Sequence, residues 1–189
     1  MVSITTFHED MVVGMLAEIV AVEYGVAPAK ARQIRLAALL HDIGKQKLQH
    51  LVNKPGKLTD AEIDAMKAHT ILGAEMLATF QGELGDMARA IALWHHEHWD
   101  GNGYFGKYLC ELPYFIEIVA IADVFTALVY ERQYKQSWPP EEAIAYIQSQ
   151  EDVKFSPVLV GIFVPLVQNN SRIAAIFKGG ERHTGRFGI

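Results

Sequence analysis

The stretch LAALLHDIGK, residues 36–45, decides how this part of the chain folds and directs attention to its chemistry. Apolar side chains recur at helical spacing from Ala31 onward, and Pro28 can occupy the first turn, so the pattern predicts a buried helix that ends at His41-Asp42. A surface position is the ordinary explanation for a His-Asp pair. At the end of a buried helix, however, both groups would be costly to bury without partners. The pair is therefore expected to have partners.

Four further short motifs carry side chains of the kind that bind divalent metals. His8 and His69 lie in separate helical segments, His95-His96 precede a glycine-rich stretch, and Asp123 lies inside the apolar run IVAIADVFTALV. An inward-facing, unpaired carboxylate such as Asp123 needs a cation. Imidazole and carboxylate hold divalent first-row metals, and seven such ligands are enough for two ions. Two bridged ions indicate hydrolysis of a phosphate ester.

Helical periodicity runs through almost the whole chain, and the alternation typical of strands is scarce. The first helix is expected to bury a stripe formed by Phe7, Met11, Val12, Met15, Leu16, Ile19 and Val20. The helix starts are indicated by capping-box pairs and prolines at Thr59-Glu62, Pro113, Pro139-Pro140 and Ser156-Pro157. Residues 44–59 are expected to form a loop. The prediction is an all-α, single-domain fold of about seven helices over residues 1–170, with a C-terminal tail, 171–189, of uncertain structure.

Composition excludes several classes of protein. The chain has 189 residues, half of them hydrophobic, which is typical of a folded domain with a sizeable core. A net charge of −5 argues against a protein that binds duplex nucleic acid. The single cysteine, Cys110, fits a reducing compartment. No signal peptide and no apolar run long enough to span a membrane is found, so a cytoplasmic protein without a membrane segment is expected.

Five motifs in the right order resemble the HD-GYP family, a bacterial branch of the HD phosphohydrolases that hydrolyses cyclic di-GMP. They are HDIGK at 41–45, NKPGKLTDAE at 53–62, MKAHTILGAEML at 66–77, HHEHWDGNGY at 95–104 and IVAIADVFTALVYERQYK at 118–135. The resemblance extends from about His8 to the segment at 154–163, which is most of the chain.

The resemblance implies a helical HD-type domain around a centre of two divalent ions. One ion would be held by His8, His41, Asp42 and Asp123. Asp42 would bridge to a second ion, which His69, His95 and His96 would complete. Iron or manganese is the expected metal, and zinc and nickel are compatible with such ligands.

The implied activity is a metal-dependent phosphodiesterase that opens cyclic di-GMP to linear pGpG and can continue to GMP. A hydroxide that bridges the ions would attack phosphorus, and Asp42 or Lys45 would handle protons. Lys45, Arg132 and Lys135 match positions that contact phosphate in the family. Tyr104, at the tip of the loop, is expected to contact either the substrate or a partner protein.

The chain departs from the family pattern at two informative positions. The signature Gly-Tyr-Pro is Gly103-Tyr104-Phe105 here, which restores a backbone N–H and is expected to affect substrate fit or the docking of a signalling partner. Ile4 stands where some members carry a glutamate that supports a third ion, so two ions are expected. Another cyclic dinucleotide, such as cyclic GMP-AMP, and a catalytically weak nucleotide-binding or protein-interaction module remain alternatives. The sequence does not indicate the oligomeric state.

Overall fold

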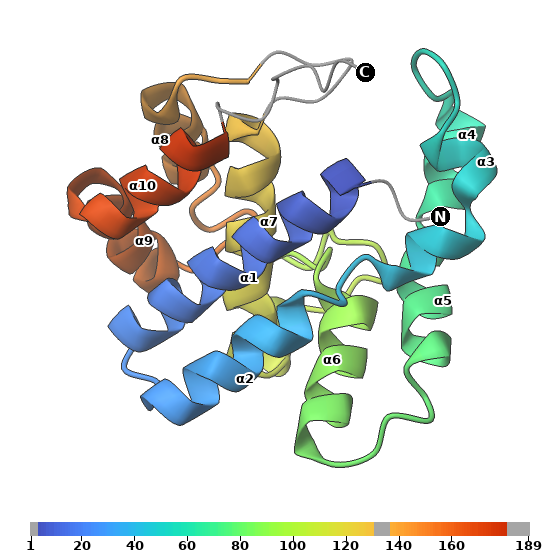
Figure 1. The fold of residues 1–189 in the computed structure, drawn as a ribbon, viewed down its shortest axis with the longest axis horizontal. Helices are drawn as coiled ribbons and strands as arrows, with labels where there is room; N and C mark the ends of the chain where they lie inside the picture. The colour runs from blue at the N-terminus through green and yellow to red at the C-terminus, as the bar shows by residue number, and fades with distance from the viewer. Residues whose placement is uncertain (1–3, 131–136, 181–189) are drawn as a thin grey trace, which may run out of the picture.

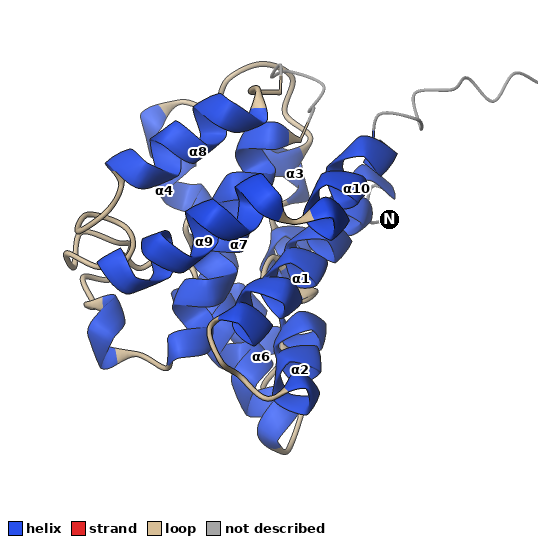
Figure 2. Cartoon of the chain, turned by 90° about the vertical axis from the view of Figure 1, so that its left-hand side faces the viewer, coloured by secondary structure: helices blue, strands red, loops and turns tan. Residues whose placement is uncertain are grey.

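The computed structural model describes residues 4–130 and 137–180, and these residues form helices without a β-strand (Figures 1 and 2). The elements are α1 (Ile4–Glu23), α2 (Pro28–Ala38), the 3-10 helix η1 (Ile43–Lys47), α3 (Gln49–Val52), α4 (Asp60–Met66), α5 (Ala68–Met76), α6 (Glu83–Trp94), the 3-10 helix η2 (Leu109–Glu111), α7 (Tyr114–Val129), α8 (Pro140–Ser149), α9 (Pro157–Asn169) and α10 (Ser171–Gly180). The prediction of an all-α fold is confirmed.

Helix α7 is the central element of the fold. In Figure 1 it runs through the middle of the molecule, with α1 and α2 packed against it, α3–α5 on the right-hand side of the view and α8–α10 on the left. Ten of its sixteen residues are buried, so it is apolar on every face, as a helix surrounded by protein must be. A carboxylate in the middle of this helix, Asp123, is therefore held inside the fold.

The buried stripe of α1 agrees with the predicted one at Val12, Leu16 and Val20 but differs from it at other positions. Met11 is 36% exposed, whereas Val13 and Ala17 are fully buried. The helix is rotated in this way because α2 crosses it closely at Gly14, where a Cβ atom would lie 2.9 Å from the carbonyl oxygen of Arg35. Small residues, not the large ones at the predicted positions, permit such a close approach of two helices.

The predicted helix starts agree with the structure. Thr59 and Glu62 form a complete capping box at the start of α4, and Ser156 accepts a hydrogen bond from the Leu159 N–H at the start of α9. The predicted loop at 44–59 is not a plain loop, however, because η1 and α3 occupy much of it. This short helical segment lies directly after the His41-Asp42 pair.

The C-terminal segment, whose structure the sequence leaves uncertain, contains a helix. Residues 171–180 form α10. Asn170 caps the helix by accepting from the backbone N–H groups of Arg172 and Ile173. Phe177 packs edge-on against Phe125 of α7, with ring centroids 5.5 Å apart. Tertiary contact, which a short segment does not reveal, therefore stabilises this helix.

In the described part of the chain, no single helix is long and apolar enough to cross a membrane, and α9 and α10 pass the same test of length and composition only as a pair bent by 76°.

Candidate metal centre

Most of the candidate ligands come from four helices, at the ends of α2, α5 and α6 and in the middle of α7. His41-Asp42 follow the last turn of α2, His69 lies in the first turn of α5, His95-His96 end α6, and Asp123 projects from the middle of α7. The rings of His41, His69 and His95 are almost completely buried. Segments that are far apart in sequence thus contribute to one buried site.

Gly44 allows the His41-Asp42 turn to approach α5. A Cβ atom at this position would lie 1.9 Å from the carbonyl oxygen of His69 and 2.5 Å from the backbone nitrogen of Gly73. No larger residue fits without moving one of the two segments. The glycine of the HDIGK motif therefore sets the distance between Asp42 and His69.

Backbone carbonyls orient three of the imidazole rings. His41, His69 and His95 each donate from Nδ1 to a carbonyl oxygen in the preceding turn, at 2.7, 2.7 and 2.9 Å respectively. In a neutral ring this leaves Nε2 with its lone pair available. Because each Nε2 faces the centre, the rings are oriented as metal ligands usually are.

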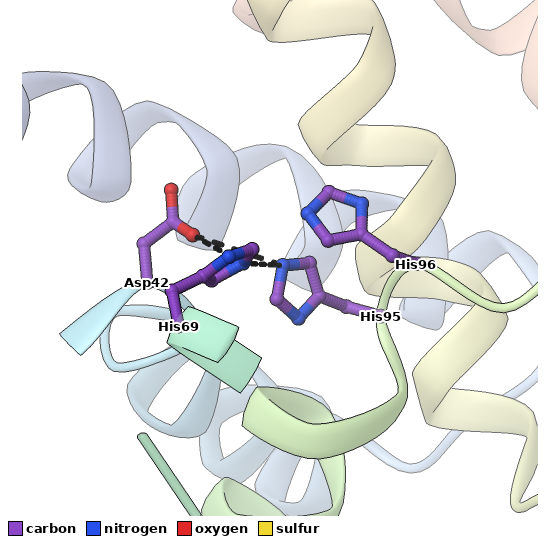
Figure 3. A group of neighbouring side chains, drawn as sticks. All are labelled: Asp42, His69, His95 and His96. Carbon is purple, nitrogen blue, oxygen red and sulfur yellow. Dashed lines mark hydrogen bonds and ion pairs between the residues drawn. The ribbon is translucent and has the colours of Figure 1, made fainter. Parts of the chain in front are cut away.

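Asp42 is the point on which these nitrogens converge, as Figure 3 shows for His69 and His95. Its Oδ1 lies 3.3 Å from His69 Nε2 and 3.7 Å from His95 Nε2. Its Oδ2 lies 3.4 Å from His41 Nε2, which is also 3.6 Å from Asp123 Oδ1. Two ligands that each lie about 2.1 Å from one ion are about 3.0–3.5 Å from each other, so these separations suit shared cations.

The candidate ligands at the end of α6 and the start of α5 are uncharged imidazoles. Burial lowers the pKa of His69 and lowers that of His95 well below the ordinary value. Burial likewise lowers the pKa of His96 to about 4. All three rings are therefore uncharged near neutral pH. Each has a nitrogen with a free lone pair, so no proton has to leave the ring before a metal binds.

The opposite side of the centre is dominated by charge. Burial disfavours the charged form of His41, but the Asp42 carboxylate and hydrogen bonds to Asp123 and Asp42 outweigh it and raise the pKa of His41 well above its ordinary value. Burial works against ionisation of Asp42 too. The charges of Lys45 and His41 nevertheless hold the pKa of Asp42 well below its usual range. The buried carboxylates of Asp42 and Asp123 therefore need positive charge beside them.

A buried oxygen without a hydrogen-bond partner supports a metal site here. Oδ1 of Asp42 is such an atom, and it faces the Nε2 atoms of His69 and His95. Because those rings are neutral and donate from Nδ1, their Nε2 atoms carry lone pairs. These lone pairs face the lone pairs of Asp42 Oδ1 at 3.3 and 3.7 Å, with no proton between them. A divalent cation would satisfy all three atoms at once, so the residues present fit a metal ion.

Six of the seven predicted ligands lie in two overlapping groups of closely spaced donor atoms. One group is Asp42, His69, His95 and His96, and the other is His41, His95 and Asp123. Among the described residues, His8 joins neither group; its Nδ1 is hydrogen-bonded to the Tyr130 hydroxyl. A third group instead pairs His41 and Asp42 with Asp10, a residue that the sequence reasoning missed. Helical spacing could have identified it, since Asp10 lies on the same face of α1 as the buried residues Val13 and Ala17.

The predicted substrate contacts are only partly described. Lys45 forms an ion pair with Asp42 and is 30% exposed, so its ammonium lies at the edge of the centre. The Tyr104 ring lies 4.5 Å from the His96 ring and 6.3 Å from that of His69, measured between centroids. Arg132 and Lys135 lie outside the described residues.

Comparison with known proteins agrees with this geometry. Residues 5–159 match the HD domain family. The chain belongs to this family. A cyclic di-GMP phosphodiesterase response regulator, RpfG of Xanthomonas campestris pv. campestris, is 40% identical over 144 residues, which are 75% of this chain and 38% of that protein. The 3'3'-cGAMP-specific phosphodiesterase 2 of Vibrio cholerae is 37% identical over 154 residues, 80% of this chain and 30% of that protein.

A solved structure shows the same fold as this HD domain. It is Bd1817, an HDG"Y"P protein from Bdellovibrio bacteriovorus, with a TM-score of 0.70 and 20% identity over 87% of this chain and 53% of the other. The expected HD-GYP type is thus confirmed. This chain spans only about a third of the length of the curated relatives named above.

Proposed function

We propose that this HD domain is a metal-dependent phosphodiesterase for a cyclic dinucleotide, with cyclic di-GMP as the favoured substrate and pGpG, and then GMP, as products. The observation that carries the proposal is the unpartnered Oδ1 of Asp42, which faces the Nε2 atoms of His69 and His95 beside the His41–Asp123 pair. The names of the relatives, which are cyclic dinucleotide phosphodiesterases, support the substrate class.

The ligands are assigned to two ions. Asp42 would bridge them, His69, His95 and His96 would complete one, and His41 and Asp123 would hold the other. His8 stays a predicted ligand of the latter ion, and Asp10 is an additional candidate on the same side. Iron or manganese is the proposed metal, since mixed imidazole and carboxylate ligands suit both, and zinc and nickel are the alternatives.

Hydrolysis forms a bond from water oxygen to phosphorus, breaks the bond from phosphorus to the 3′ oxygen, and delivers a proton to that oxygen. Two bound ions would supply a water of lowered pKa and positive charge beside the phosphoryl oxygens. Asp42, as a shared ligand, would fix the position of one ion site relative to the other. Lys45, whose side chain is partly exposed, provides positive charge for the phosphate and a proton donor at the edge of the centre. Arg132 and Lys135 are proposed to contact the second phosphate.

Cyclic GMP-AMP is the second candidate substrate, because a relative at 37% identity carries that name. The base preference is proposed to depend on the loop that carries Tyr104. Phe105 in the same loop is 41% exposed, and its apolar ring is where we place the predicted contact with a signalling protein. We assign the catalytic unit to residues 1–170.

The test combines metal analysis with hydrolysis. Purified protein is loaded anaerobically with iron or manganese, its metal content is measured by elemental mass spectrometry, and cyclic di-GMP and 3'3'-cGAMP are supplied at equal concentrations. Two ions per chain and formation of a linear dinucleotide are expected. Two bound ions without turnover of either compound would favour a binding module, and turnover by metal-free protein would contradict the proposed centre.

A further inference from the structure

A buried carboxylate next to the metal centre has no role in the chemistry proposed above. Glu97 directly follows His95-His96, and it is 2% exposed. Its Oε1 accepts the Phe105 N–H at 2.8 Å, and its Oε2 accepts the Lys107 N–H at 2.6 Å. Both carboxylate oxygens are therefore used to hold the backbone of the glycine-rich loop.

Backbone amides, not a basic side chain, compensate this buried charge. No ion pair with Glu97 is found within residues 8–130 and 137–177. A buried carboxylate is costly, and hydrogen bonds to a charged acceptor are about twice as strong as neutral ones. Removing either N–H would leave part of the charge unsatisfied. The loop and the carboxylate therefore hold each other in place.

The loop is folded back on its own base by contacts that leave little freedom. The Tyr104 N–H donates to the His96 carbonyl at 3.3 Å, and a Cβ atom at Gly103 would lie 2.4 Å from the Glu97 Cα. Gly101 and Gly106 take positive φ angles of 78° and 75°, which permit the sharp turns on either side. The consequence is that Tyr104 lies against His96, at the edge of the metal centre.

One of the two hydrogen bonds depends on the residue type at position 105. A proline there has no N–H and could not donate to Glu97. In this chain the residue is phenylalanine, and its N–H makes the 2.8 Å bond. The departure from Gly-Tyr-Pro thus adds a second attachment of the loop.

We propose that Glu97 is a positioning residue that fixes Tyr104 as a preformed wall of the substrate site, and that the Phe105 N–H is a specific part of this attachment. The part that concerns substrate rests on the proposed phosphodiesterase function. The attachment itself does not, because it is a property of the loop in the absence of any ligand.

Amide hydrogen exchange tests the attachment without substrate. Exchange at the Lys107 amide is measured by NMR in the metal-loaded wild type, Glu97→Gln, Phe105→Pro and Phe105→Ala. Loss of a bond to a charged acceptor is expected to speed exchange at Lys107 by about tenfold in Glu97→Gln and severalfold in Phe105→Pro. Phe105→Ala keeps the N–H and removes the ring, which packs edge-on against Trp94 with centroids 5.6 Å apart, so exchange should rise less than in Phe105→Pro. Equal exchange in Phe105→Pro and Phe105→Ala would overturn the proposal.

Steady-state kinetics test the positioning role. Glu97→Gln and Phe105→Pro are expected to raise KM for cyclic di-GMP by about tenfold and severalfold, with kcat within about twofold and two ions still bound. Glu97→Gln keeps one acceptor oxygen for two N–H groups, and Phe105→Pro removes one of these groups, so the double variant should raise KM by less than the product of the two single effects. Faster exchange with an unchanged KM would also overturn the proposal. Failure of the wild type to hydrolyse any cyclic dinucleotide would instead contradict the proposed function and leave the exchange result to decide the attachment.

Discussion

The two sides of the metal centre are built in opposite ways. His69, His95 and His96 form a side of neutral imidazoles, with pKa values lowered by burial. On the other side His41 is surrounded by carboxylates, and its pKa is raised despite its burial. Asp42 belongs to both sides. The three neutral imidazoles thus offer lone pairs without losing a proton, whereas the carboxylates around His41 carry negative charge that needs a cation.

The largest effect is expected where the two sides meet. Asp42→Ala removes the proposed bridging ligand, so both ions should be lost. Because two-metal catalysis supplies several kcal/mol of transition-state stabilisation, hydrolysis should fall by about 1000-fold or more. Elemental analysis and a hydrolysis assay measure the two losses together. Two tightly held ions in this variant would show that Asp42 is not the bridge.

Substitutions on one side should separate the two ions. His69→Ala is expected to leave one ion per chain, held on the His41 side, and Asp123→Ala to leave one ion on the imidazole side. Each variant should lose about 100-fold in activity, because one ion can still polarise the phosphate. Metal titration by calorimetry distinguishes the sites. Loss of both ions from either variant would mean that the sides do not bind independently.

On the charged side, His8 and Asp10 are competing candidates for a further ligand of the ion near His41. Asp10 lies in a group with His41 and Asp42, whereas the His8 ring contacts Tyr130. Asp10→Asn should therefore weaken the ion on the His41 side by about tenfold, with a smaller effect from the matched His8→Gln. Competition with a fluorescent chelator measures both affinities. The reverse order would restore His8 as the main ligand.

In metal-free protein the two sides should respond oppositely to pH. The lowered pKa values of His69, His95 and His96 mean that the folded protein binds fewer protons than the unfolded chain, so stability should fall as pH decreases below about 6.5. His41, with its raised pKa, contributes stability that is present below about pH 6.5 and lost as pH rises through its folded pKa.

Urea unfolding of the metal-free protein, measured from about pH 5 to pH 9, checks this contrast. His96→Asn should reduce the loss of stability on the acid side, and His41→Asn the loss on the alkaline side. An acid-side slope that is unchanged in His96→Asn would show that this ring does not stay neutral.

The smallest effect is expected away from both sides. Ser156 caps α9 by accepting the Leu159 N–H at 3.1 Å, so Ser156→Ala should lower the free energy of unfolding by about 1 kcal/mol. Metal content and hydrolysis should be unchanged. Thermal unfolding and the hydrolysis assay together provide the baseline against which the variants at the centre are judged.

Much of the fold and the ligand set could be predicted from the chain alone. Helical periodicity and capping residues are local signals, and they placed α2, α4, α8 and α9 well. The burial of His41-Asp42 followed from the apolar run before it. The burial of Asp123 followed in the same way from the runs on either side. Helix α10 escaped prediction because its stability comes from the contact of Phe177 with Phe125.

The sequence by itself determined the helical class, the HD-type motifs and the kinds of ligand available, because these depend on residue type and on spacing along one helix. Only the tertiary structure decided which donor atoms meet. The rotation of α1, set by its close crossing with α2 at Gly14, turns Asp10 towards His41. The fold of the glycine-rich loop brings the Phe105 N–H to Glu97. Both depend on contacts between segments, and a pattern within one segment does not specify them.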